Sequence, residues 1–315
     1  MSPTMRAVEW MQGVLDCTAK RLFRWSGAAS LLILLLACAV APQAQQPAQQ
    51  PAQQPAPGQK VIQSKAEYDA YMAALNTPDA TGRAEGLAAF VQDYPKSVVL
   101  ADALEQEMAA WQAAGDTSQV KRVAKRLLEV DSGNIRALGI VVALDRMSVE
   151  KGDVTALNEM CTDASGGVLA VPMWQKPANM SEADFAALGK LMKEVFIGAE
   201  GYCAVQQKNY SQARDWLTRA LEIDNTDVQD NYQLAVADLE MTPADASGFW
   251  YCAKATQLAQ SAAIPQDASA MAGYCKAQYA KYHGGDDGWD AIVQEAAAED
   301  APPKDFGKKI KPAQK

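Results

Sequence analysis

From residue 65 onward, apolar residues recur at the three- and four-residue spacing of amphipathic helices, and Val and Ile seldom alternate with polar residues as they do in strands. Gly and Pro fall between these helical stretches, at distances typical of short helix-turn-helix units. The abundance of Ala and Leu favours helices that approach one another closely through small side chains. The pattern therefore predicts an all-α fold built from helical hairpins.

The clearest unit spans residues 194–227, with a turn at residues 208–210 between its two helices. One face of the second helix carries Ala213, Leu217, Ala220 and Leu221. Small residues on this face, and Gly201 in the first helix, let the two backbones approach while Leu217 fills the groove between them. This arrangement of small and large residues resembles a tetratricopeptide repeat.

A second unit spans residues 101–134 and has the 34-residue length of that family, with its turn at Gly115-Asp116. Residues 135–160 predict a degenerate hairpin between the two units, and residues 163–184, with Gly166-Gly167 and two prolines, predict an inserted loop that breaks the helices. Weaker helical stretches flank the units at residues 65–95, 231–235, 248–253 and 264–282.

The resemblance implies an α-solenoid whose concave face, lined by the first helix of each hairpin, binds a peptide or protein partner. The residues that it places along this groove are Glu105, Ala109, Gln112, Tyr202, Val205, Gln206, Gln229 and Tyr232. No Lys/Arg cluster lies among them, so the capture of a terminal carboxylate is not indicated. For Tyr202 and Tyr232, packing between repeats is an equally good interpretation.

The N-terminus has the pattern of an export signal, because three basic residues precede an uncharged apolar run at residues 31–41. The run is shorter than the roughly 20 apolar residues of a membrane span. Cleavage after Ala44 is favoured. Leu35-Leu36-Ala37-Cys38 resembles a bacterial lipobox, so lipidation of Cys38 and a membrane tether through it remain an alternative.

Four segments follow from these patterns. The segment after the signal has no large apolar side chain to bury, and its regular prolines indicate an extended, disordered spacer. The last residues are rich in Lys and are expected to be flexible. The predicted division is a signal at 1–44, a Pro/Ala/Gln linker at 45–63, a helical repeat domain at 64–299 and a flexible tail at 300–315.

The sequence predicts no catalytic residues, no metal site and no cofactor. His283 is the only histidine, and no nucleophile turn, P-loop, dinucleotide-binding glycine motif or Cys-x-x-Cys pair is present. The formal charge of −9 argues against a nucleic-acid partner. An acidic loop carries Asp286, Asp287 and Asp290. We interpret it as a helix boundary in which Gly284 and Gly285 end one helix, Asp286 or Asp287 caps the next, and Trp289 packs beneath.

Without Cys17 and Cys38, which lie in the signal, four cysteines remain. An even number suits an exported protein in an oxidising compartment. Cys252 and Cys275 lie about equally far from the turn near Ile264-Pro265, so an antiparallel hairpin would place them side by side. A disulfide between them is slightly favoured over two buried free thiols. The sequence provides no comparable argument for Cys161 with Cys203.

Residues 281–290 resemble a C-terminal element of uncharacterised exported repeat proteins of acidobacterial type, a likeness that brings no activity with it. The leading hypothesis is an exported scaffold in the periplasm or cell envelope that holds a protein or peptide partner. One rival is a lipid-anchored accessory subunit of an outer-membrane assembly or secretion complex. The other is an enzyme with an unfamiliar site at the acidic loop.

Overall fold

The computed structural model describes residues 60–177, 180–262 and 265–313. These residues form α-helices and one short 3-10 helix, and no strand occurs among them. The predicted signal at 1–44, Cys38 and most of the predicted linker lie outside the described residues. The helices are α2 (Lys65–Leu75), α3 (Ala80–Asp93), α4 (Leu100–Ala114), α5 (Thr117–Val130), α6 (Ile135–Glu150), α7 (Val154–Ala170), η1 (Val171–Met173), α8 (Glu182–Gln206), α9 (Tyr210–Leu221), α10 (Val228–Glu240), α11 (Gly248–Ser261), α12 (Pro265–His283), α13 (Trp289–Ala298) and α14 (Phe306–Lys309).

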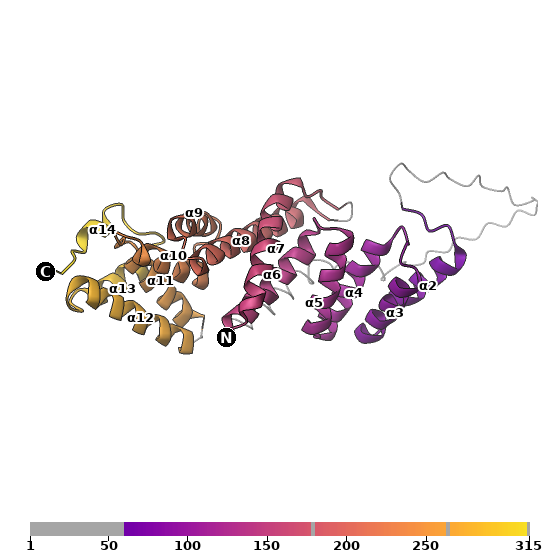
Figure 1. Ribbon diagram of the computed structural model, residues 1–315, viewed down its shortest axis with the longest axis horizontal. Helices are drawn as coiled ribbons and strands as arrows, with labels where there is room; N and C mark the ends of the chain where they lie inside the picture. The colour runs from indigo at the N-terminus through magenta and orange to yellow at the C-terminus, as the bar shows by residue number, and fades with distance from the viewer. Residues whose placement is uncertain (1–59, 178–179, 263–264, 314–315) are drawn as a thin grey trace, which may run out of the picture.

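Helices that follow one another in the chain also pack against one another, from the contact of α2 with α3 to that of α11 with α12. They are arranged in chain order along the long axis of the molecule, with α2 near one end and α14 near the other (Figure 1). Contacts also join alternate helices, since α8 touches both α6 and α10. We call α4, α6, α8 and α10 the first helices, because each opens a hairpin.

Turn chemistry sets the ends of these helices. Gly115 has the left-handed conformation (φ 79°), which ends α4, and the side chain of Asp116 then accepts hydrogen bonds from the first turn of α5 at 3.1 and 3.0 Å. Lys208 also has a positive φ of 59°, and Asn209 caps α9. Both turns lie where the sequence predicts them.

The close helix crossing predicted around Gly201 is present. A Cβ placed on Gly201 would lie 2.5 Å from Cγ of Leu217, so only glycine fits there. Ala213, Leu217 and Ala220 are fully buried. The α8–α9 pair therefore depends on small residues that let a leucine reach the opposite backbone.

The loop predicted at residues 163–184 is wrong over most of its length. Helix α7 continues through Gly166-Gly167 to Ala170, and of the described residues in this stretch only 174–177 and 180–181 are irregular. Gly167 is needed for packing, because a Cβ on it would lie 2.3 Å from the buried ring of Phe196. A glycine that admits a neighbouring ring looks the same in a sequence as one that ends a helix.

The C-terminal segment is not a free tail over residues 300–313, contrary to the prediction. Phe306 and Ile310 are only 1% and 7% exposed and join the cluster formed by α11, α12 and α13. The amide of Ala313 donates to the carbonyl of Tyr282 at 2.7 Å, and Lys309 pairs with Glu295 at 3.1 Å. Two buried apolar residues are therefore enough to order a segment that is otherwise rich in lysine.

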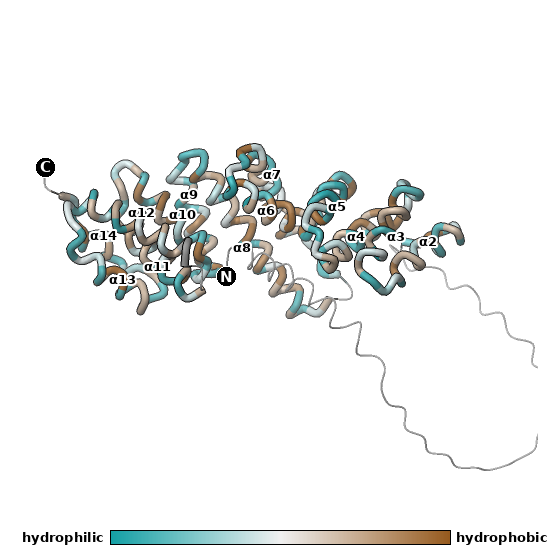
Figure 2. The backbone as a smooth tube through the Cα atoms, turned by 90° about the horizontal axis from the view of Figure 1, so that it is seen from below, coloured by the Kyte–Doolittle hydropathy of each residue, from teal (hydrophilic) through white to brown (hydrophobic). Residues whose placement is uncertain are grey.

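The core is a series of local clusters along the row of helices. One cluster spans α2 to α6, the next spans α6 to α8, a third spans α8 to α10, and another at the C-terminal end spans α10 to α14. Figure 2 shows hydrophobic and hydrophilic positions mixed along every helix, as expected when each helix buries one face against its neighbours. No helix among the described residues is both long enough and apolar enough to cross a bilayer.

Candidate functional site

Six of the predicted groove residues lie on first helices with their side chains at least partly accessible. Glu105, Ala109 and Gln112 on α4 are half-buried, as are Gln229 and Tyr232 on α10, and Gln206 at the end of α8 is exposed. The side-chain amide of Gln112 is itself buried, so this residue presents no polar group to the groove. Glu105 accepts a hydrogen bond from Nδ2 of Asn134 at 2.6 Å. The ring of Tyr232 packs edge-on against Tyr274 at 5.9 Å, so it contributes to packing between helices as well.

Tyr202 and Val205 do not line a groove, which corrects the prediction. They are 6% and 8% exposed, and both belong to core clusters. The guanidinium of Arg146 lies 5.2 Å from the centre of the Tyr202 ring, a cation–π contact between α6 and α8. Tyr202 therefore packs between hairpins, the second of the two interpretations that the sequence allowed.

The contact of Arg146 with Tyr202 belongs to a charged junction where α6, α8 and α10 meet. Glu194, Gly198 and Tyr202 follow one another at four-residue spacing along one face of α8. Gly198 leaves room for Asp230 of α10, because a Cβ on Gly198 would lie 2.5 Å from Oδ2 of that aspartate. Arg146 reaches Asp230 from α6, with 3.7 Å between Nη2 and Oδ1.

Burial changes the titration of this junction. Burial, together with the neighbouring carboxylates of Asp230 and Asp227, raises the pKa of Glu194 to about 9, and Arg146 opposes this rise only in part. Burial and the carboxylate of Asp227 likewise raise the pKa of Asp230 to about 7, against the lowering effect of Arg146. One arginine does not compensate several carboxylates, so near neutral pH the junction retains protons.

Similar pairs occur elsewhere along the row. Each consists of a carboxylate on a first helix that is fully buried, or nearly so, and a cation from a neighbouring helix. They are Glu107 with Arg122 at 3.1 Å, Asp145 with Lys121, and Asp238 with Arg214 at 3.1 Å. Because removing one member of such a pair would leave an uncompensated buried charge, these pairs fix how successive helices meet. Their chemistry is that of structural ion pairs.

The acidic loop is structural, but its details differ from the prediction. The N-cap of α13 is Gly288, whose φ is 85° and which has no side-chain capping bond, so neither Asp286 nor Asp287 caps the helix. Asp286 pairs instead with Lys276 at 2.9 Å, and the hydrogen bond from this lysine lowers the pKa of the Asp286 carboxyl. Trp289 is buried beneath the loop, as expected.

Asp290, the third acid of the loop, is exposed. Within residues 60–177, 180–262 and 265–313, no three His, Cys, Asp or Glu side chains gather in a way that could hold a metal ion. His283 serves packing: its ring stacks on Tyr279 at 5.2 Å, and its Nδ1 lies 2.9 Å from the carbonyl of Lys311.

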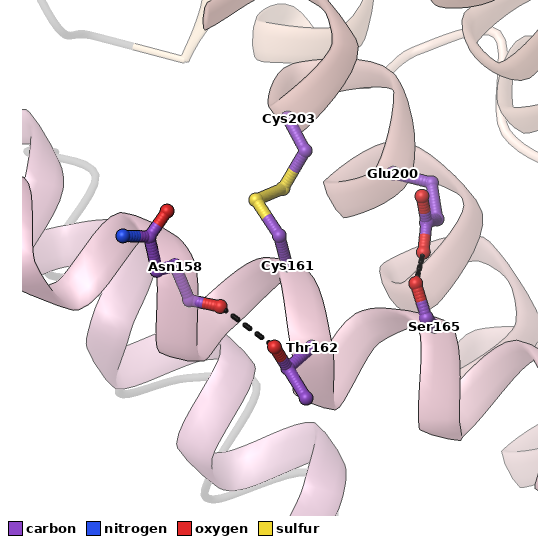
Figure 3. The surroundings of a disulfide bond; sticks show 6 residues. All are labelled: Asn158, Cys161, Thr162, Ser165, Glu200 and Cys203. Atoms are coloured by element: carbon purple, nitrogen blue, oxygen red, sulfur yellow. Dashed lines mark hydrogen bonds between the residues drawn. A yellow bond between two sulfur atoms is a disulfide. The ribbon is translucent and has the colours of Figure 1, made fainter. Parts of the chain in front are cut away.

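The four cysteines of the described region form two disulfides. Cys252–Cys275 joins α11 to α12, and Cys161–Cys203 joins α7 to α8 (Figure 3). Beside the second bridge, α7 and α8 are also linked by the hydrogen bond from Ser165 to Glu200. The sequence did not indicate this bridge, because the loop predicted at 163–184 hid the α7–α8 hairpin.

No protein-family model matches the chain, and the comparison with curated proteins finds no significant match. Function therefore has to be argued from the arrangement of the helices and from the chemistry of their surfaces.

Proposed function

We propose that this protein is an exported scaffold of the tetratricopeptide type, an α-solenoid that holds a peptide or protein partner along its first helices. The observation that carries the proposal is the order of packing. Consecutive helices pair along the row, and α8 contacts the first helices on both sides of it. A surface made by parallel first helices is long, continuous and open, and it suits an extended partner.

The side chains on this surface support the assignment. The residues we assign to the inner surface are Glu105, Ala109, Gln206, Gln229 and Tyr232, which are all at least partly accessible, whereas the side-chain amide of Gln112 is buried. They are polar or small, apart from one tyrosine, a composition suited to reversible contact with a peptide backbone. The buried ion pairs beneath keep the first helices in fixed relation, so little ordering would be needed on binding.

Export is supported by the cysteines. Both disulfides lie within the helical region and together use all four of its cysteines. Bridges of this kind persist in oxidising compartments and are rare in the cytosol. This agrees with the basic residues and apolar run at the N-terminus, so the periplasm or cell envelope is the proposed location.

The test uses the full chain as bait for cross-linked partners from the native envelope. Ala109→Arg with Gln206→Arg places bulk and charge on the inner surface without touching the core. We expect recovery of the partner to fall at least tenfold. Glu129→Arg, at the exposed end of the second helix α5, is the matched control and should leave recovery unchanged. Equal recovery by all three proteins would refute the assignment of the inner surface.

A further inference from the structure

A second surface feature lies at the C-terminal end of the row, and it is lined by none of the residues assigned to the inner surface. It is a polar cavity of about 490 Å³, between α9, the α10–α11 loop and the C-terminal segment. Its charged lining consists of Arg214, Lys304, Lys308 and Asp245. A cluster of three cations is unexpected in a chain whose formal charge is −9.

The two lysines reach the cavity because the C-terminal segment is anchored. Phe306 and Ile310 are buried on either side of α14, and Lys304 and Lys308, four residues apart, line the cavity from this segment. Figure 1 shows α14 at the end of the row, where the chain turns back toward α10 and α11. Residues 90 or more positions apart in the sequence thus line one site.

These lysines have no carboxylate within ion-pair distance among the described residues. Their neighbour Lys309 does, since it pairs with Glu295 at 3.1 Å. Both side chains are exposed, so their charge is available to a ligand.

The acids around the cavity are already engaged. Asp245 accepts hydrogen bonds from Arg214 and from the amide of Ser247, the latter at 2.9 Å, and these bonds hold the pKa of Asp245 below its usual value despite partial burial. Asp238 is buried behind them, with Oδ1 3.1 Å from Nε of Arg214. Because burial raises the pKa of Asp238 to about 7, the charge of Arg214 is balanced mainly by Asp245, and the two lysines supply the remaining positive charge.

We propose that this cavity binds the phosphate group of a small ligand between Lys304 and Lys308. Its volume falls within the range of about 300–1,000 Å³ typical of small-molecule sites. Lysine acts on phosphate as a point charge and needs no fixed fork geometry, which suits two flexible cations on one rim. The hydroxyl of Ser247 lies in the same lining near Gly307, but it already hydrogen-bonds Asp245, so the two lysines are the donors left for a ligand.

Gly307 keeps the cavity open. A Cβ on this residue would lie 3.4 Å from Oγ of Ser247, in ordinary contact, and any longer side chain would project into the space beside it. Gly307→Val therefore fills the site without changing a charge, so it separates binding in the cavity from general attraction to lysines.

The test measures binding to the full mature chain at low ionic strength. The soluble probes are inorganic phosphate and glycerol phosphate, followed by calorimetry. The lipid probe is vesicles containing phosphatidylglycerol, compared with vesicles of phosphatidylcholine alone. Binding of the soluble probes identifies a free phosphate ligand, and binding of the anionic vesicles alone identifies a lipid headgroup as the source of the phosphate.

We expect Lys304→Gln with Lys308→Gln, and separately Gly307→Val, to weaken binding at least tenfold. Lys311→Gln is the matched control, because this lysine lies in the same segment and outside the cavity, and it should keep wild-type affinity. The proposal is overturned if neither probe class binds the wild-type chain. It is equally overturned if the control loses as much affinity as the double variant, or if Gly307→Val binds normally.

Discussion

The contact between Gly167 and Phe196 offers the sharpest test of the fold. A methyl group added at Gly167 would lie 2.3–2.4 Å from three atoms of the Phe196 ring, which is fully buried. Overpacking of this kind costs roughly 1–3 kcal/mol. Alanine in place of glycine inside a helix recovers about 1 kcal/mol. We therefore expect Gly167→Ala to destabilise the protein by up to about 2 kcal/mol.

The adjacent glycine is the matched control. A Cβ on Gly166 would lie 3.7 Å from Cδ2 of Leu138, an ordinary contact, so Gly166→Ala should gain roughly 0.5–1 kcal/mol from helix propensity alone. The two substitutions are chemically identical and differ by one position. Their opposite signs follow only if α7 is a continuous helix packed on α8.

The assay is urea denaturation followed by far-ultraviolet circular dichroism, with Phe196→Leu added to complete a double-mutant cycle. A smaller side chain at position 196 should relieve the strain, giving a coupling between the two positions of at least about 1 kcal/mol. Equal stability of Gly167→Ala and Gly166→Ala would contradict a continuous α7 packed on α8, because it is the result expected if both glycines lay in a loop.

Three further outcomes are expected. The folded chain raises the pKa of Glu194 to about 9, so it keeps a proton on this carboxyl that the unfolded chain releases at lower pH. Thermal stability should therefore fall as the pH rises from roughly 5 to 9, and Glu194→Gln should flatten that decline. Replacing Cys252 and Cys275 by Ala removes a bridge across 23 positions, which should cost about 3 kcal/mol in chemical denaturation. Phe306→Ala removes the main anchor of the C-terminal segment, so hydrogen exchange over residues 300–313 should accelerate, at a cost of about 3 kcal/mol.

Each of these outcomes has its control. For the pH dependence of stability, the control is Glu129→Gln at the exposed end of α5. If this variant flattened the decline as much as Glu194→Gln does, the decline could not be attributed to the buried junction. For the bridge, non-reducing peptide mapping that recovers only free thiols would remove its basis. For the C-terminal segment, Lys311→Ala is the control and should leave hydrogen exchange over residues 300–313 unchanged. If the Phe306→Ala variant exchanged there at the wild-type rate, Phe306 would not be what orders the segment.

The sequence predicted what depends on neighbours in the chain. The hairpins at 101–134 and 194–227, and the close approach at Gly201, follow from spacing within two adjacent helices. It did not predict the junction around Asp230, because Arg146, Glu194 and Asp230 come from three helices and meet only when the register of all three is known. An aspartate in a helix ordinarily indicates an exposed face.

Two other errors have the same origin. The low helix propensity of glycine predicts a break in the helix at Gly167, whereas its packing against Phe196, 29 positions later, explains why glycine stands there. The C-terminal segment was interpreted from its lysines, whereas Phe306 and Ile310 decide whether it is ordered. The exposure of Tyr202 could not be inferred either, since its partner Arg146 lies in the preceding hairpin. Long-range partners are the information that local patterns lack.

The division of the core into successive clusters has a mechanical consequence. Each hairpin is held by its immediate neighbours, so separation can begin at an end and proceed one hairpin at a time. The two ends differ in their resistance to unfolding. The C-terminal end is covered by α14 and cross-linked by the disulfide between α11 and α12. At the other end, α2 contacts only α3 extensively, and Tyr68 is half exposed. Tension applied through the N-terminus would therefore peel α2 and α3 away first, while the α6–α8–α10 junction stays closed.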